Sequence, residues 1–357
     1  MKTLIFFVCL FASGRSRFRK YQCSDNNNGK KVYIDDVEAI KEDLIENLFR
    51  NRFDRYAHTL RLAFHDCVEG CNGCINRDNP GNFGPMLDTL TVMDEIYEDR
   101  VEDIMSRADF YVLTALTALE QSLQFNNNNL TSNQITPPDF KFKYGRCDCD
   151  TTPFSRKLLR FPDTIIDFPG GNFGHTQVMD FFREEFGLNN RLATALMGAH
   201  TLGGAAGPSA SGFQGFWKEG QVESFRFNNR YYQLLVDNNL DWENIDQSTV
   251  NGFPRPRWQW QAGTVTLPGP QPVTIPAPFM LNADVVLFKT IVPDEDGRSS
   301  CEFRNCPPAP TARFVQRYAG NGDKWAKDFA KAFKKMTSTG SAGLRKPKQR
   351  RRGGQAV

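Results

Sequence analysis

The stretch RLAFHDC at residues 61–67 decides how this chain folds, and a second stretch, GAHTLG at residues 198–203, complements it. Each is an apolar run that is compatible with a helix and contains a single histidine. Arg61 and His65 are four residues apart, so on a helix they share one face, with Phe64 beside them. A cation, an imidazole and an aromatic ring on one face are typical of a redox site rather than of a core helix.

Length and charge limit the possible classes of protein. A chain of 357 residues with 40% hydrophobic content can bury a large core, as one big helical domain or two smaller ones. The net charge of +3 is too small to indicate a nucleic-acid partner. Six positive charges lie in RKPKQRRR at residues 345–352, so the rest of the chain has a charge of 3 − 6 = −3. We predict that residues 338–357 form a basic, disordered tail, which is either merely solvated or held on anionic glycans or membranes.

The N-terminus has the features of a secretion signal. Lys2 precedes an apolar run at residues 4–12, and residues 12–14 (ASG) are small enough for cleavage. The run is too short to span a bilayer and no other segment is as hydrophobic, so no transmembrane segment is expected. We therefore predict a signal peptide at residues 1–14, an N-terminal extension at residues 15–31 and a secreted protein.

Cleavage at this place removes Cys9 and leaves an even number of cysteines, which indicates disulfides in an oxidising compartment. The cysteines that stay are Cys23, Cys67, Cys71, Cys74, Cys147, Cys149, Cys301 and Cys306. The cluster at residues 67–74 has a spacing that radical enzymes use for an iron–sulfur cluster, but such clusters need a reducing compartment. The sequence does not choose among the possible disulfide connectivities. A glycosylation sequon at residues 129–131 agrees with secretion.

Helical periodicity dominates the rest of the chain. It predicts helices at residues 35–49, 56–67, 87–97, 104–122, 176–186, 191–200 and 323–336. The helix at 104–122 is unusually apolar, and we expect it to be central. Between residues 252 and 278, proline, glycine and tryptophan dominate and apolar residues alternate, which predicts a small β excursion on a helical body.

Several of these motifs stand in the order found in the plant, fungal and bacterial haem peroxidase superfamily, which the chain resembles over residues 32–337. The distal helix of that family supplies an arginine, an aromatic residue and a histidine, which correspond to Arg61, Phe64 and His65. An asparagine that orients the distal histidine corresponds to Asn82. The resemblance makes residues 32–337 a single haem peroxidase domain.

The proximal side resembles cytochrome c and ascorbate peroxidases. The GAHT motif resembles the one that carries the iron ligand, here His200, and the SGFQGFW segment resembles the one that brings a tryptophan, here Trp217, under the haem. The MLNAD segment resembles the one whose aspartate, here Asp284, bonds the ligand; the alternative is a simple helix cap. The distal aromatic residue and the cysteines instead follow the secreted plant enzymes. We interpret the remaining histidines, His58 and His175, as ordinary core residues.

The resemblance implies a mainly α, two-lobed fold that holds haem b between the distal and proximal helices, with a minor β part. It also implies an enzyme that reduces hydrogen peroxide to water through a ferryl intermediate while it oxidises a small reducing substrate of unknown identity. In this scheme His65 transfers the peroxide proton, Arg61 stabilises the departing oxygen and Phe64 shapes the pocket. Trp217 either relays an electron or only packs in the core.

Two expectations concern further ligands. Asp66 and Thr201 occupy positions that bind structural calcium in the secreted plant enzymes, although Asn228 stands where an aspartate is expected. The arginine that ascorbate peroxidases place before the SGF motif is replaced by Ala210, so an ascorbate site of that kind is not expected. The alternative function is a catalytically silent, secreted haem-binding or structural protein of the same fold. Its signature is the loss of the distal arginine or histidine, and the chain has both.

Overall fold

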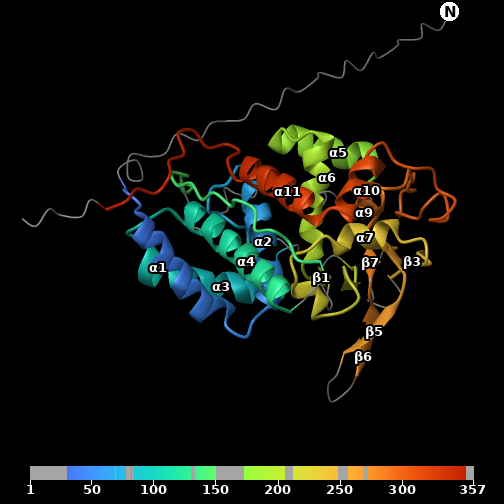
Figure 1. Cartoon of the computed structure of the whole chain (residues 1–357), viewed down its shortest axis with the longest axis horizontal. Helices are drawn as coiled ribbons and strands as arrows, with labels where there is room; N and C mark the ends of the chain where they lie inside the picture. Colours follow the sequence, from blue (N-terminus) through green and yellow to red (C-terminus); the bar gives the residue numbers. More distant parts are fainter. Residues whose placement is uncertain are drawn as a thin grey trace, which may run out of the picture.

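The computed structural model describes residues 30–68, 70–77, 82, 84–129, 133–149, 173–205, 212–247, 256–267 and 272–350. Helices account for most of the regular structure in these ranges and the strands are short, which confirms the predicted mainly α fold (Figure 1). Within the same ranges, no helix combines the length and the hydrophobicity that crossing a bilayer requires.

The helices occur where the periodicity predicts them, with three additions that it does not predict: α7, α9 and α10. The α-helices are α1 (Ile34–Leu44), α2 (Asp54–Cys67), α3 (Pro85–Ile96), α4 (Arg107–Asn129), α5 (His175–Phe186), α6 (Asn190–Met197), α7 (Arg230–Val236), α9 (Asn282–Val285), α10 (Ala312–Gly320) and α11 (Gly322–Met336). Helices α1 and α3 continue as π-helical turns at Ile45–Phe49 and Tyr97–Val101, and 3-10 helices cover Gly198–Thr201 and Glu223–Phe225. The strands are β1 (Gly204–Ala205), β2 (Gly215–Phe216), β3 (Glu243–Asp246), β4 (Trp258–Gln261), β5 (Thr264–Leu267), β6 (Val273–Pro276) and β7 (Phe279–Met280).

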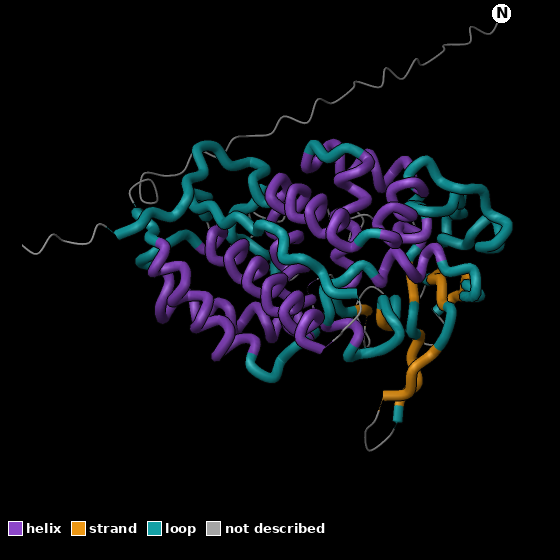
Figure 2. Tube along the Cα trace, in the orientation of Figure 1, coloured by secondary structure: helices purple, strands orange, loops and turns teal. Residues whose placement is uncertain are grey.

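Helix α4 is central, as its apolar sequence predicts. Every residue from 108 to 119 is buried, and the helix packs against α2 and α1. Figure 2 shows α1–α4 as one group of helices and α5–α11 as a second group, with α2 reaching toward the second. In the second group α11 packs against α6, and α10 packs against α7. This arrangement places residues 61–67, which contain His65, and residues 198–203, which contain His200, in different halves of the molecule.

The helix pair α5 and α6 is separated at Gly187, as predicted. Gly187 has a left-handed conformation with φ 62°, and the N–H of Leu188 donates to the carbonyl oxygen of Phe182 over 3.0 Å. A left-handed glycine followed by such a bond is a common way to end a helix. The side chain of Asn189 then accepts from the N–H of Leu192 over 3.0 Å and starts α6.

The predicted β excursion is present and supports the short helix α9. Strands β3, β4 and β7 form an antiparallel sheet, and β5 pairs with β6 in a separate hairpin. Strand β7 leads directly into α9. The indole N–H of Trp260 in β4 donates to Oδ1 of Asn282 over 2.8 Å, and the amide of Asn282 donates to the carbonyl of Gly297 over 2.7 Å. The sheet therefore fixes where α9 lies.

All cysteines in the described ranges are oxidised, as the even count predicts. The bridges are Cys67–Cys71, Cys74–Cys149 and Cys301–Cys306, and Cys147 is also disulfide-bonded. Because the cysteines of the 67–74 cluster are all used in disulfides, this cluster cannot bind an iron–sulfur centre. Cys23 and the predicted signal peptide lie outside the described residues.

The prediction of a disordered tail from residue 338 is wrong for residues 338–350. The N–H of Ile34 donates to the carbonyl of Lys348 over 2.9 Å, and Tyr144 and Arg345 exchange two backbone hydrogen bonds of 2.9 Å each. The segment is thus ordered by backbone pairing with two other parts of the domain. The prediction rested on the lack of apolar residues to bury, and amino-acid composition does not reveal backbone hydrogen bonds to distant segments.

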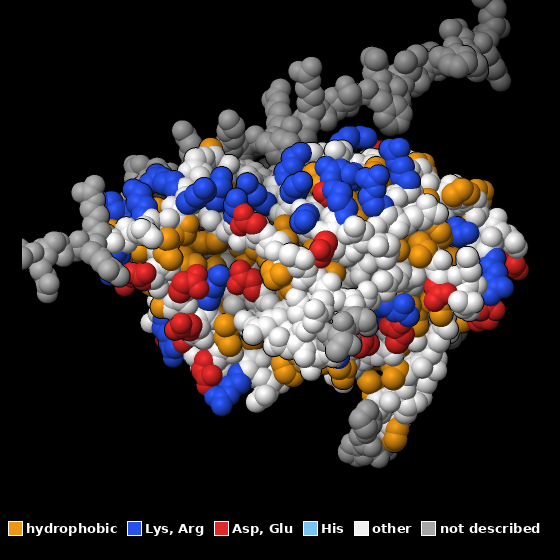
Figure 3. All heavy atoms as spheres, viewed as in Figure 1, with side chains coloured by type: hydrophobic (Ala, Val, Ile, Leu, Met, Phe, Trp, Pro, Cys, Tyr) orange, Lys and Arg blue, Asp and Glu red, His pale blue; other side chains and the backbone are white. Residues whose placement is uncertain are grey.

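Basic side chains gather on one face of the molecule, over α11 and residues 338–350 (Figure 3). The exposed lysines and arginines on these two elements are Lys327, Lys331, Lys334, Lys335, Arg345, Lys346, Lys348 and Arg350. The positive charge expected for a free tail is therefore partly built into the folded surface.

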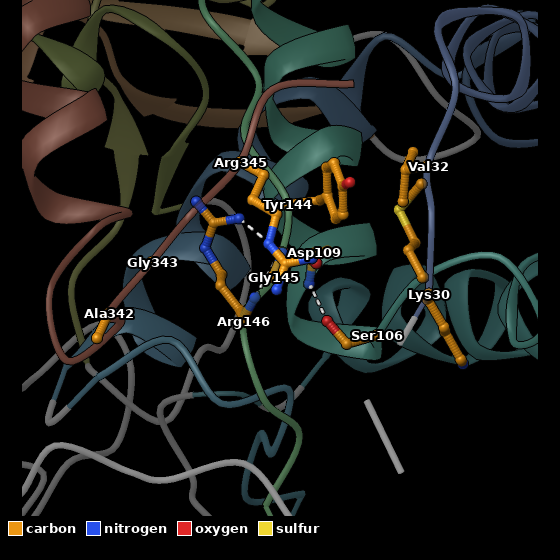
Figure 4. Close-up of a pocket in the computed structure, with 11 residues that line it drawn as sticks. Lys30, Val32, Ser106, Asp109, Tyr144, Gly145, Arg146, Ala342, Gly343 and Arg345 are labelled. Atoms are coloured by element: carbon orange, nitrogen blue, oxygen red, sulfur yellow. Dashed lines mark hydrogen bonds and ion pairs between the residues drawn. The ribbon is translucent and has the colours of Figure 1, made fainter. Parts of the chain in front are cut away.

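A cavity of about 190 Å³ lies beside residues 342–345 (Figure 4). Its lining includes the buried ion pair of Arg146 and Asp109, whose Nη1 and Oδ1 atoms are 2.7 Å apart. Neither His65 nor His200 lines it. The cavity is therefore separate from the residues that the sequence assigns to the functional site.

We predict that the long-range disulfide stabilises the fold more than the short one. Cys74 and Cys149 are 75 residues apart, whereas Cys301 and Cys306 are 5 residues apart. Because loop-closure entropy grows with loop length, replacing the first pair by serine should lower the free energy of unfolding by about 4 kcal/mol, against about 2 kcal/mol for the second pair. Urea unfolding of both double variants and of the parent protein measures the difference. Equal losses would contradict the prediction.

Candidate functional site

Helix α2 brings Arg61 and His65 together on one face, as their spacing predicts. The Nε–H of Arg61 donates to Nε2 of His65 over 3.2 Å. His65 is 9% exposed, whereas Arg61 is exposed. Atoms packed around Arg61 nevertheless lower the pKa of its guanidinium through desolvation. The pair therefore lies at the edge of the core, with His65 buried and Arg61 in contact with both protein atoms and solvent.

Asn82 completes the distal group, although it follows His65 by only 17 residues. An amide oxygen can only accept, so Nδ1 of His65 donates to Oδ1 of Asn82, over 2.5 Å. The amide nitrogen of Asn82 donates to the backbone carbonyl of Asn76 over 2.7 Å, which fixes the end of the amide that faces the histidine. His65 is thereby held with its hydrogen on Nδ1 and a lone pair on Nε2.

The imidazole of His65 is neutral over almost the whole pH range. Burial, reinforced by the positive charge of Arg61, lowers the pKa of His65 to about 3, while the hydrogen bond to Asn82 opposes this shift. At any pH above about 4 the ring is therefore available as a base. Arg61 stays protonated, because a guanidinium does not lose its proton in proteins.

Phe64 connects α2 to α5 through an aromatic cluster. Its ring centroid lies 6.2 Å from that of Phe181, 6.4 Å from that of Phe182 and 5.8 Å from that of Phe186. The tilted arrangement of these rings is favourable for aromatic packing. Phe64 itself is half-buried and its centroid is 6.0 Å from that of His65. It therefore forms an apolar wall next to the distal histidine.

On the proximal side, α6 passes into the 3-10 helix Gly198–Thr201, which carries His200. Glycine is needed at position 198, because a Cβ there would collide with the hydroxyl of Tyr232 and with the indole of Trp325. These two side chains donate to backbone carbonyls of α6 over 2.7 Å and 3.1 Å. The turn that carries His200 therefore packs directly against the side chains of Tyr232 and Trp325.

The structure brings His200 and Asp284 together, 84 residues apart in the sequence. Nδ1 of His200 donates to Oδ1 of Asp284 over 2.7 Å. The carboxylate is fully buried, and it also accepts from the hydroxyl of Tyr231 over 2.7 Å and from the N–H of Leu281 over 2.8 Å. Asp284 therefore both caps the start of α9, as the alternative interpretation proposes, and bonds His200.

Sequence reasoning missed Tyr231. It lies in α7, a helix that the periodicity does not reveal, and its ring is fully buried. Burial and the nearby charge of Asp284 raise the pKa of Tyr231 well above its ordinary value, so the hydroxyl remains a donor. The only available signal was chemical, because a buried tyrosine hydroxyl needs a polar partner.

Trp217 stacks on His200, with ring centroids 4.1 Å apart and an interplanar angle of 4°. Its other face stacks on Phe279 at 4.3 Å. Among the described residues, none accepts a hydrogen bond from its indole N–H, and the donors to the Asp284 carboxylate are His200, Tyr231 and Leu281 instead. Trp217 is therefore held by stacking.

The chemistry of His200 and Asp284 fits a haem, whose iron His200 would bind. Asp284 occupies Nδ1 of His200, which leaves Nε2 for a metal, and 33% of the His200 side chain is exposed while its carboxylate partner is buried. The two halves also meet closely three residues after His200, because a Cβ on Gly203 would lie only 2.6 Å from Cβ of Ala57 in α2. An open nitrogen on an imidazole ring that a carboxylate orients is a ligand that haem iron takes.

The calcium expectation receives no support from a ligand cluster: in the described ranges, no group of three or more His, Cys, Asp or Glu side chains is placed to hold a metal ion. Asp66 is buried and accepts from the N–H of Cys74 over 3.1 Å. Burial and the charge of Asp148 raise the pKa of Asp66 to about 7. The hydroxyl of Thr201 donates to the carbonyl of Asn228 over 2.7 Å. Calcium at Asp66 and at Thr201 stays a prediction.

The two other histidines have hydrogen-bond partners that suit core residues. Nδ1 of His58 lies 2.9 Å from the hydroxyl of Thr89, and burial lowers the pKa of His58 to about 4. Nε2 of His175 lies 3.1 Å from the hydroxyl of Thr311. Both threonine hydroxyls donate to backbone carbonyls, so each accepts from its histidine.

Comparison with known proteins agrees with this geometry. The model of the peroxidase family matches residues 41–292. A mitochondrial cytochrome c peroxidase of Cryptococcus neoformans is 29% identical over 327 residues, which cover 86% of this chain and 68% of that protein. A basic peroxidase of Zinnia elegans is 25% identical over 338 residues, 86% of this chain and 84% of that protein. A mitochondrial cytochrome c peroxidase of Aspergillus fumigatus is 30% identical over 210 residues, 58% of this chain and 43% of that protein, so the chain spans less than half of that relative.

Proposed function

The chain belongs to the peroxidase family and is a haem-dependent enzyme that uses hydrogen peroxide, and from this premise we propose that it is secreted and takes its electrons from a small reducing substrate. The observation that carries the peroxidase chemistry is the pairing of two oriented histidines, His65 through Asn82 and His200 through Asp284. When bound, the haem supplies an iron with one open position for peroxide. The silent alternative is disfavoured, because the distal arginine and histidine are both present and oriented.

The distal residues handle the proton and the developing charge. His65 accepts the proton of the bound peroxide at Nε2 and returns it to the departing oxygen. Asn82 supports this role, since it keeps the ring hydrogen on Nδ1. Arg61 donates toward the same nitrogen in the resting site and is placed to stabilise negative charge on the departing oxygen, an effect of about 3 kcal/mol for one well-placed donor.

The proximal residues set the electron donation of the iron ligand. His200 would hold the haem iron through Nε2, and the hydrogen bond from Nδ1 to Asp284 makes the ring a stronger donor. Tyr231 donates to the same carboxylate oxygen and so withdraws part of its negative charge from His200. The tyrosine therefore moderates the effect of the aspartate.

Two observations favour a small donor over a protein donor. An oxidised indole is stabilised by a carboxylate on its N–H, and Trp217 makes no such bond within the described ranges, which makes it a poor relay to a partner at the surface. The face formed by α11 and residues 338–350 is basic and repels positively charged proteins that approach it (Figure 3). The cytochrome c named in several relatives is thus a weaker candidate than a small molecule that reaches the haem edge.

Secretion is supported by the disulfides of the described cysteines, which persist in oxidising compartments. The apolar start of the sequence and the sequon at residues 129–131 agree with this location. Outside the cell, the basic residues 345–352 would attract anionic glycans or membrane surfaces.

We predict that His65→Leu slows the reaction with hydrogen peroxide by at least about 10²–10⁴-fold, because one residue serves both as base and as acid. Arg61→Leu should cost less, and His58→Gln, a matched change on the same helix, should leave the rate within about twofold. The parental rate should be independent of pH from about 4 upward, because the pKa of His65 is about 3. Stopped-flow mixing with peroxide measures all four. A parental rate in His65→Leu would refute the assignment.

The donor is tested with two electron sources, a small phenol and reduced cytochrome c. We expect steady turnover with the phenol and at least about tenfold less with the protein, since a cationic partner meets a basic face. Trp217→Phe keeps the stacking but removes the oxidisable indole, and it should leave phenol turnover within about twofold. Faster turnover with cytochrome c that is lost in Trp217→Phe would show a protein donor and a tryptophan relay.

Secretion predicts a processed chain. Protein recovered from the medium of expressing eukaryotic cells should begin after residue 14, because the signal peptide is removed on export. Intact mass and N-terminal sequencing measure this, and thiol counting on the denatured, unreduced protein should find no free cysteine. A chain that stays inside the cell and begins at Met1 contradicts the proposed location but leaves the haem chemistry untouched.

A further inference from the structure

Lys218 is the residue after Trp217, and its side chain is fully buried. Its Nζ donates to the carbonyl oxygen of Arg226 over 2.7 Å and lies 3.4 Å from Oδ1 of Asn228. No carboxylate of the described chain is within ion-pair distance of this ammonium. A buried cation is costly unless oxygen atoms replace its hydration shell, so this one is expected to have a function.

The oxygens around Lys218 belong to a segment that supports the proximal histidine. The hydroxyl of Thr201, next to His200, donates to the carbonyl of Asn228 over 2.7 Å. The N–H of Gly203 donates to the carbonyl of Ser224 over 2.8 Å. Residues 224–228 thus receive hydrogen bonds both from the turn of His200 and from Lys218, which ties them to Trp217.

The oxygens around Lys218 form a cation site that the ammonium of Lys218 already occupies. Backbone carbonyl and side-chain amide oxygens are ligands that calcium prefers. Asn228 supplies an amide where an aspartate is expected, so the site has lost negative charge. Oδ1 of Asn228 also accepts from the N–H of Arg230 over 3.0 Å, and its Nδ2 donates to Asn126 over 2.8 Å, so both polar atoms of that side chain already have protein partners. The donor set therefore fits one ammonium and does not fit a calcium ion in addition.

We propose that the ammonium of Lys218 is the structural cation of the proximal side. It takes the place of the calcium ion expected at Thr201 and holds residues 224–228 against the turn that carries His200. Lys218 is therefore a positioning residue: it acts on the iron ligand through the segment between them.

The experiments must be done at a pH at which the Lys218 amine carries its proton. Burial lowers the pKa of Lys218 to about 7, Glu223 and Glu219 act in the opposite direction, and Arg226 and Arg230 lower it further. At pH 6 the amine is therefore protonated, and the experiments are done there.

The first experiment uses the parent holoenzyme. After dialysis against a calcium chelator at pH 6, the frequency of its iron–histidine stretch should be unchanged, because the proposal places no calcium ion on the proximal side. If calcium binds only at Asp66, the metal content rises but the frequency of the iron–histidine stretch does not respond to the chelator. If the frequency of the iron–histidine stretching vibration shifts when calcium is removed, the proposal is wrong.

The second experiment replaces the cation. Lys218→Ser leaves the oxygens without a donor and should lower the melting temperature by several degrees and shift the iron–histidine stretch in the ferrous Raman spectrum. Added potassium or methylammonium should partly restore the melting temperature and the Raman frequency of Lys218→Ser. Lys218→Arg should stay closer to the parent than Lys218→Ser in both quantities. Lys289→Ser is the matched control, because Nζ of Lys289 also donates to a backbone carbonyl, that of Cys306 over 3.4 Å, but is only partly buried. It should respond to neither cation.

The outcomes separate the proposal from a simple packing role. If Lys218→Ser loses stability but neither cation restores stability or the Raman frequency, the side chain serves only to fill space and the proposal is wrong. If Lys218→Ser matches the parent in every measurement, it is wrong as well. If Lys218→Ser does not fold, the chelator experiment on the parent still decides the question.

Discussion

The carboxylate of Asp284 is the group on which the proximal half depends. It is fully buried and accepts three hydrogen bonds, from His200, Tyr231 and Leu281. A buried charge is tolerated only when its oxygens are satisfied, so each donor must be delivered to the same point. The three donors come from the turn after α6, from α7 and from the start of α9. The positions of these elements are therefore linked, and the sheet that supports α9 also determines the orientation of the iron ligand.

Much of the fold could be predicted because its helices have a clear period. The apolar run around residues 108–119 indicates the central helix α4, and Gly187 marks the break between α5 and α6. Helices α7 and α9 are too short for periodicity to register. Helix α10 has a strong apolar face and could have been found from its sequence, but the proline-rich loop at residues 307–310 directly before it obscures where a helix begins.

The site was predictable where a residue belongs to a motif and not where tertiary contact creates the role. His65, His200 and Asp284 stand in recognisable segments, and Asn82 was found by its type and order despite an unusual interval. Tyr231 has no motif, because its role consists in reaching a carboxylate 53 residues away. The order of residues 338–350 was missed for a similar reason, since backbone pairing with distant segments leaves no trace in composition.

The pairing of Lys348 with the segment around Tyr33 brings the two ends of the described chain to the same place on the surface. The distance between the ends of a domain determines whether the chain can be closed into a ring without strain. Here a short linker would suffice, and new ends could be opened in an exposed loop elsewhere. Circular permutation is therefore open to this fold, and it would allow the two groups of helices to be joined in a different order along the chain.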